Sequence, residues 1–212
     1  METHELIKAL AADSRRTGVP MNTVWWGAVL IAIAIATTVF FALLGPRPDI
    51  ASAAQTVRFL FKFLVTIALG ASAFALLRML SRPEADARGV LPCLAIAPAL
   101  ILAGVAIELI VSPAETWPAR LVGTNSLVCL TFIPLIGIGP LALLLLALRH
   151  GAASHPTLAG AIAGLLAGGI AATLYASHCP DDSPLFVATW YTIAVAGLAL
   201  LGTLGGRYVA RW

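Results

Sequence analysis

The stretch LVGTNSLVCLTFIPLIGIGPLALLLLAL, residues 121–148, decides the fold, because these 28 residues between Arg120 and Arg149 carry no charged side chain. About 20 apolar residues in helical form cross the roughly 30 Å hydrocarbon core of a membrane. The stretch is therefore long enough to span a membrane, with about eight residues to spare. Counting back from Arg149 places Cys129 at the far boundary of this span. We expect residues 121–128 to form extra helix or a segment at the membrane interface.

The composition of the whole chain extends this conclusion. Of the 212 residues, 60% are hydrophobic and 11% are charged, and the mean hydropathy is +0.95. Soluble domains are about 45–50% apolar and about 25% charged, so the apolar excess must face lipid. Six apolar runs are long enough to cross a bilayer: residues 24–44, 57–79, 90–111, 121–148, 157–177 and 185–206. We therefore predict an all-α integral membrane protein, a bundle of six transmembrane helices.

The two ends of the chain are predicted to lie on the same side of the membrane. Residues 1–23 are polar, contain no signal-peptide core and are expected to remain as an aqueous segment. Residues 24–206 would form the transmembrane domain, and residues 207–212 a short tail. Sorted by connection, nine of the 13 cationic residues fall on the side of the termini: Lys8, Arg15, Arg16, Arg78, Arg82, Arg88, Arg149, Arg207 and Arg211. By the positive-inside tendency, both termini are expected to be cytoplasmic.

Two of the three cysteines are predicted to meet near the far side of the membrane. The fourth and fifth spans share a short connection, so they are expected to be antiparallel neighbours with Cys129 and Cys179 at similar depth. Such a pair could form a disulfide, or could offer a metal soft and borderline ligands together with His178 and Asp181. Cysteines in apolar helices are more often small hydrophobic residues, and this interpretation stays open. No resident cofactor is expected; a heavy-metal ion would enter only as a transient signal.

Two charges lie inside the predicted spans. Lys62 and Glu108 are each within a few residues of the far end of a helix, and a mutual pair would lower the cost of holding charge near lipid. The alternative is that both side chains extend separately to the interface. No charge is predicted at the midplane, which argues against a proton pump or an ion-coupled transporter.

Glycines recur every four residues in the last two spans. Gly160, Gly164 and Gly168 lie in the fifth, and Gly202 and Gly206 in the sixth. Small-residue faces of this kind let helix backbones approach closely. We interpret them first as internal packing and second as a surface for a homo-oligomer.

The aqueous N-terminal segment carries one short apolar stripe, formed by Leu6, Ile7 and Leu10 and followed by Asp13. The stripe is either a lead-in to the first span that lies on the membrane surface or a docking helix for a cytoplasmic partner. The segment has no room for a catalytic or zinc-binding domain.

Three stretches of the sequence stand out: GPRPDI at 45–50, TNSLVCL at 124–130 and HCPDDSPLFVATWY at 178–191, the last being the most specific. Together with the six-span layout, they resemble one known family, the NrsF type of bacterial membrane-bound anti-sigma factors. The resemblance implies an inner-membrane protein that holds an extracytoplasmic-function (ECF) sigma factor inactive and releases it under stress, with heavy metals or oxidants as signals. It also implies that the N-terminal segment docks the sigma factor. Cys129 and Cys179 match the family's two cysteine positions, which are associated with sensing.

Two other classes of protein are kept as alternatives. A small multi-pass transporter or channel is favoured by the six spans and by Pro134 and Pro140, which should bend the fourth span. A membrane enzyme is disfavoured, because no nucleophile and base accompany the cluster of His178, Asp181 and Asp182. Direct binding of nucleic acid is not expected. We therefore predict a regulator without catalytic activity, in contact with the lipid bilayer and a sigma factor.

Overall fold

The computed structural model describes residues 3–5, 8, 21–81, 89–151 and 155–209. Every regular element in this part of the chain is helical. The main helices are α2 (Met21–Leu43), α3 (Ile50–Ala53), α4 (Val57–Leu80), α5 (Ile96–Val111), α6 (Trp117–Val122), α7 (Ser126–Leu148), α8 (Pro156–Ala176), α9 (Pro184–Phe186) and α10 (Thr192–Val209). Short turns precede three of them: Leu91–Ala95 before α5, Ala114–Thr116 before α6, and the π-helical turn Val187–Tyr191 before α10. Six helical segments are long and apolar enough to cross a membrane, which confirms the predicted fold class.

Local residues explain where the spans begin. The Thr56 hydroxyl accepts a hydrogen bond from Phe59 N at 3.4 Å and so caps the first turn of α4. Pro156 and Pro184 stand in the first turns of α8 and α9, where the missing N–H removes no helical hydrogen bond.

The surplus length of the fourth run becomes a separate helix. α6 ends at Val122, and Gly123 follows with a φ of +60°, in the left-handed region that glycine reaches without strain. α7 then begins at Ser126 and continues through Pro134 and Pro140 to Leu148. The extra helix thus lies earlier than expected: of residues 121–128, only the first two belong to α6, 123–125 form the turn, and 126–128 already belong to the span.

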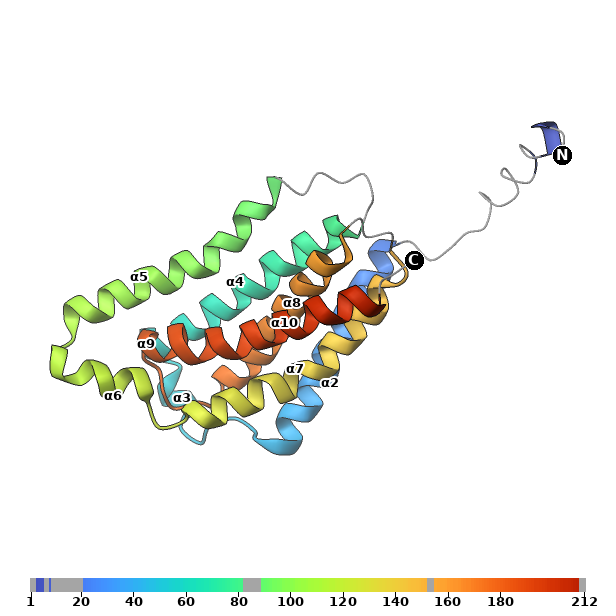
Figure 1. The fold of residues 1–212 in the computed structure, drawn as a ribbon. Helices are drawn as coiled ribbons and strands as arrows, with labels where there is room; N and C mark the ends of the chain where they lie inside the picture. Colours follow the sequence, from blue (N-terminus) through green and yellow to red (C-terminus); the bar gives the residue numbers. More distant parts are fainter. Residues whose placement is uncertain (1–2, 6–7, 9–20, 82–88, 152–154, 210–212) are drawn as a thin grey trace.

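α8 is the central helix of the bundle. It packs against α10, α4, α7 and α2, and most of its side chains are buried. α5 lies at the edge of the bundle beside α4, and much of its surface is exposed (Figure 1). The bundle thus has a close-packed centre and one loosely attached span.

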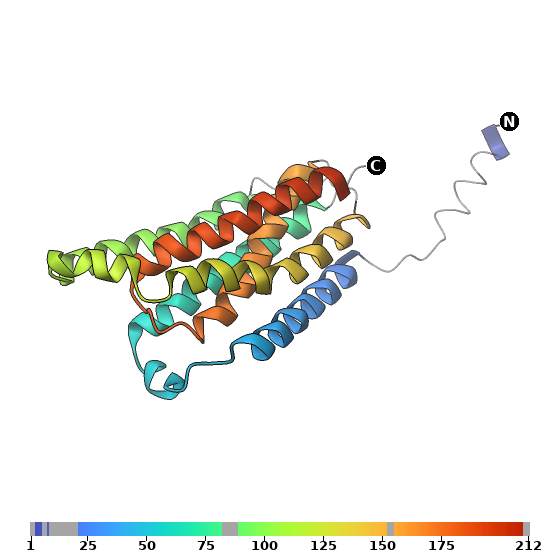
Figure 2. The same ribbon diagram turned by 60° about the horizontal axis from the view of Figure 1, so that its bottom comes forward.

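The two ends of the bundle differ in character. The start of α2 and the end of α10 lie together at one end, which we call the terminal end, whereas α3, α6 and α9 lie at the other (Figures 1 and 2). The first span therefore begins, and the last span ends, at the terminal end; that this end faces the cytoplasm stays a prediction. We call the other end the Cys179 end, after the residue whose carbonyl oxygen accepts hydrogen bonds from both Arg47 and Lys62.

The glycine face of α8 is used inside the molecule. A Cβ added at Gly160 would lie 2.1 Å from the Gly202 carbonyl oxygen, and one at Gly164 would lie 2.3 Å from the Leu198 carbonyl oxygen. α8 and α10 therefore meet backbone to backbone. Internal packing, the first interpretation of these glycines, is confirmed; a homo-oligomer would need another surface.

Candidate functional site

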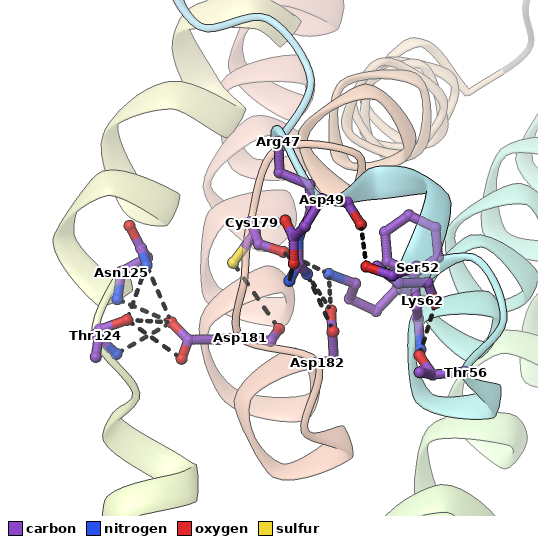
Figure 3. Close-up of polar contacts among 12 residues, drawn as sticks. Arg47, Asp49, Ser52, Thr56, Lys62, Thr124, Asn125, Cys179, Asp181 and Asp182 are labelled. Atoms are coloured by element: carbon purple, nitrogen blue, oxygen red, sulfur yellow. Dashed lines mark hydrogen bonds and ion pairs between the residues drawn. The ribbon is translucent and has the colours of Figure 1, made fainter.

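Residues 177–183, which we call the Cys179 loop, join α8 to α9 and are fixed by contacts from distant parts of the chain. The first contacts come from Arg47, between α2 and α3. Its backbone N–H donates to the Ser177 carbonyl at 3.0 Å, and its guanidinium lies 3.1 Å from Asp182 Oδ2 and 2.7 Å from Asp49 Oδ2 (Figure 3). The hydrogen bond between the two side chains lowers the pKa of Asp49 and raises that of Arg47. Both groups therefore stay charged at neutral pH.

Lys62 of α4 reaches the same loop from inside the protein. Its side chain is fully buried, and its Nζ lies 2.5 Å from Asp182 Oδ1 and 2.8 Å from the Cys179 carbonyl oxygen. A buried ammonium group is tolerated only when it is paired and hydrogen-bonded, and Lys62 has both an anion and a carbonyl. We call Arg47, Asp49, Lys62 and Asp182 the ion cluster. It joins the α2–α3 connection, α4 and the Cys179 loop.

Asp181, the neighbouring acid, contacts the start of α7. Its Oδ2 accepts hydrogen bonds from Thr124 N at 3.0 Å and Asn125 N at 2.9 Å, so it satisfies two free amide groups at the helix start (Figure 3). Gly123 makes this approach feasible, because a Cβ there would lie 2.9 Å from Asp181 Cγ and 2.5 Å from the Phe186 ring. The two consecutive acids thus connect the loop to different helices, Asp181 to the start of α7 and Asp182 to α4.

Both predicted sensor thiols are buried beneath these contacts. Cys129 and Cys179 belong to the same hydrophobic cluster, neither is solvent-exposed, and both are free thiols. Burial raises the pKa of the Cys179 thiol, so it is protonated at neutral pH. The phenol oxygens of Tyr175 and Tyr191 are also buried in this cluster and have no hydrogen-bond partner among the described residues. The cluster therefore combines two thiols with two unsatisfied hydroxyls.

The four predicted metal ligands are not assembled into one set. His178 Nδ1 lies 2.9 Å from the Gly45 carbonyl oxygen, and this contact requires the hydrogen on that nitrogen. The Asp181 carboxylate accepts hydrogen bonds from the backbone amides of Thr124 and Asn125, just before α7. Across the described residues, no group of three or more His, Cys, Asp or Glu side chains could hold a metal ion. Only the two thiols, Cys129 and Cys179, share one buried environment.

The predicted pair between Lys62 and Glu108 is wrong. Each lies near the Cys179 end, as expected, but Lys62 pairs with Asp182, whereas Glu108 pairs with Arg58 at 3.0 Å and also with Arg120. Charge alone could not select among these partners, because all of them lie near one end of the bundle.

Sequence reasoning also missed the roles of Arg47 and Asp182. The available signal was the placement of four cations and the 181–182 acidic pair on the same side of the membrane. The predicted docking residues Leu6, Ile7, Leu10 and Asp13 lie outside the residues that the structure describes.

The three stretches that resemble one family converge on this site. Gly45 and Arg47 come from the first, Thr124 and Asn125 from the second, and the Cys179 loop from the third. The fold and the site define a multi-spanning helical membrane protein whose polar contacts between spans concentrate at the end opposite its chain termini.

Comparison with known proteins agrees with this convergence. The family described as "Negative regulator of sigma F" (NrsF) matches residues 10–212. The chain is 36% identical over 216 residues to the anti-sigma-F factor NrsF of Caulobacter vibrioides, and 33% identical over 220 residues to the probable anti-sigma-F factor NrsF of Azospira oryzae. Both alignments cover 100% of this chain and 100% of the relative. No solved structure matches significantly. The chain belongs to the NrsF family of negative regulators of sigma F.

Proposed function

We propose that this protein is an inner-membrane anti-sigma factor that sequesters an ECF sigma factor on its cytoplasmic side and releases it in response to heavy metals or oxidants. The full-length similarity to proteins named anti-sigma-F factors carries the regulatory role. The cationic bias of the terminal side supports a cytoplasmic location for both termini. In this arrangement the Cys179 end faces the periplasm.

The convergence of the three stretches on the Cys179 loop is the observation that supports sensing at this end. The docking segment precedes α2, which begins at the terminal end, so a signal at the Cys179 end would have to act on it along the length of the bundle. Three helices, α4, α7 and α8, connect the two ends of the bundle. α4 carries Lys62, α7 begins at the Asp181 contact, and α8 leads directly into the loop. A change at the loop therefore acts on helices that extend toward the docking side.

The chemistry of the signal follows from the two thiols. An oxidant would join the sulfurs of Cys129 and Cys179 in a disulfide, accepting two electrons as the two thiols release two protons. A soft metal ion would instead bind two thiolates and displace the same two protons. Because burial raises the pKa of Cys179, either reaction is slow while the loop is closed. Opening of the loop is thus the controlled step.

Docking is assigned to the N-terminal segment, through Leu6, Ile7 and Leu10 with Asp13 beside them. An amphipathic helix of this kind presents a narrow apolar stripe to a groove on its partner. An isolated helix of this length is not stable in water, so stable helical structure would depend on the partner.

Co-purification from membranes tests the docking assignment. We expect the Leu6→Ala, Ile7→Ala, Leu10→Ala triple variant to lose the sigma factor while remaining in the membrane. The matched control removes two leucines and one isoleucine from exposed positions in the bundle, Leu102, Leu127 and Ile110. If the N-terminal triple variant retains the sigma factor as the control does, the docking assignment is wrong.

A reporter of the sigma regulon tests the sensing assignment. The Cys129→Ser, Cys179→Ser double variant should no longer respond to metal or oxidant. Cys93→Ser, which removes the partly buried third cysteine in the turn before α5, should respond normally. A response from the double variant equal to that of wild type removes the cysteines from the mechanism but leaves sequestration itself intact.

A further inference from the structure

A groove between α4 and α5 opens beside a second group of charges near the Cys179 end. It has a volume of about 450 Å³ and is lined by apolar side chains that include Phe61, Leu64 and Leu100. Arg58 and Glu108 line its charged end. The groove belongs to the one loosely attached span and is separate from the thiols and the ion cluster.

Arg120 pairs with Glu108 beside the charged end of the groove and gives this group of charges a net positive charge. Glu108 is 4% exposed and pairs with both Arg58 and Arg120, whose side chains are 46% and 30% exposed. We call these three residues the charge triad. Two guanidinium groups against one carboxylate leave a formal charge of +1. Each arginine has five N–H donors, and each directs one to Glu108 among the described contacts, so others are available to a ligand.

The triad lies at the level of a membrane interface. The Trp117 indole donates to the Ser112 carbonyl at 3.1 Å, and the Trp190 indole donates to the Leu121 carbonyl at 2.7 Å. Trp117 is the first residue of α6, which also carries Arg120, and Trp190 contacts α6 through Leu121. Tryptophans favour the headgroup region of a bilayer, where the apolar ring and the polar N–H are both accommodated.

The length of the groove matches one membrane leaflet. From Glu108 to Leu100 the groove follows α5 for eight residues, which corresponds to about 12 Å of helix. Half of a hydrocarbon core is roughly 15 Å thick. An acyl chain that starts at the triad would therefore run along the groove to near the midplane.

We propose that this groove binds one anionic phospholipid, with an acyl chain between α4 and α5 and its headgroup phosphate on Arg58 and Arg120. Guanidinium groups bind phosphate oxygens through paired, charge-assisted hydrogen bonds. The surplus positive charge selects a lipid with net negative charge over a zwitterionic one. The lipid would fill the gap beside the edge helix and hold α5 to the bundle.

Native mass spectrometry of the full chain in mild detergent tests the proposal, with phosphatidylglycerol and phosphatidylethanolamine added separately. We expect one phosphatidylglycerol to be retained in preference to phosphatidylethanolamine. Arg58→Gln and Arg120→Gln should each weaken its retention roughly three- to tenfold. The matched control is Arg149→Gln, which removes an exposed cation from the terminal end and should leave retention unchanged. Arg58→Lys preserves the charge and should lie between wild type and Arg58→Gln.

Two further arms separate a lipid site from a phosphate site. Ala103→Phe places a ring in the groove from an exposed position and should reduce phosphatidylglycerol retention while the triad stays intact. Glycerol phosphate, which has no acyl chain, should not displace the lipid. The proposal is overturned if the two lipids are retained equally, or if the two arginine variants behave as Arg149→Gln does. It is also overturned if Ala103→Phe has no effect, or if glycerol phosphate displaces the lipid.

Discussion

Replacement of Lys62 by methionine should release the Cys179 loop. The lost ammonium group lowers the pKa of the Cys179 thiol, so its removal can only reduce the thiolate fraction, and faster alkylation must come from opening of the loop. Methionine preserves an unbranched apolar stem but removes the ammonium group that contacts Asp182 and the Cys179 carbonyl oxygen. Loss of one partner from a buried ion pair costs about 3–5 kcal/mol. Asp182 is 21% exposed and keeps Arg47, so we expect the smaller cost of about 2 kcal/mol.

This cost predicts a rate that can be measured. If the substitution destabilises the closed state of the loop relative to the open state by about 2 kcal/mol, the population of the open state rises roughly 30-fold. Alkylation of Cys179 by a membrane-impermeant maleimide, in a Cys93→Ser, Cys129→Ser background, should accelerate by the same factor at fixed pH. The assay can be run on intact membranes or on detergent-solubilised protein. Because the other two cysteines are replaced, the labelling rate of every variant reports on Cys179 alone.

Matched variants make the result decisive. Asp182→Asn should also accelerate alkylation, and the double variant with Lys62→Met should fall short of the sum of the two effects, because both remove the same pair. Arg149→Gln removes a cation at the terminal end and should label at the wild-type rate. If Lys62→Met labels no faster than Arg149→Gln, the ion cluster does not hold the loop closed.

Three further results follow from the described contacts. Gly123→Ala should destabilise the protein by about 1–3 kcal/mol in thermal unfolding, because its φ is +60° and a Cβ would lie 2.5 Å from the Phe186 ring; an unchanged melting temperature would contradict this. Gly164→Ala should cost about 3 kcal/mol, since the added Cβ meets helix backbone at 2.3 Å, whereas Gly197→Ala meets nothing within 4 Å and should be neutral or stabilising; equal effects would refute the close packing. Because a raised pKa leaves less thiolate at each pH, the rate of reaction of iodoacetamide with Cys179 should rise over a higher pH range in the folded protein than in the unfolded chain; superimposable profiles would show that burial does not control this thiol.

The spans were predictable because crossing a bilayer demands a length and an apolarity that few sequences satisfy by chance. α8 was expected at 157–177 and is observed at Pro156–Ala176, and the run at 57–79 became α4, Val57–Leu80. The glycine spacing also predicted a close helix contact correctly. The length and apolarity of a span are properties of a single segment, and the glycine spacing repeats along a single segment. Both can therefore be identified without knowing which helices are neighbours.

The ion pairs were not predictable in the same way. The sequence places Lys62, Glu108 and Asp182 near one end of the bundle, but partner choice depends on which helices are neighbours and on the path of the Cys179 loop. α6 brings Arg120 to this end, and the uncharged α9 packs against both α5 and α6. The backbone carbonyl of Cys179, which is a principal partner of Lys62, leaves no signal in the sequence at all.

The central position of α8 has a consequence for how the protein is made. It is the most buried of the six spans and the least apolar. Its glycine face is matched by the backbone of α10, which the ribosome synthesises last. While the nascent chain enters the membrane, this face has no native partner and lies open to lipid or to the insertion machinery. Arrival of the final span therefore completes the bundle, and a chain cut short before α10 leaves its central helix half covered.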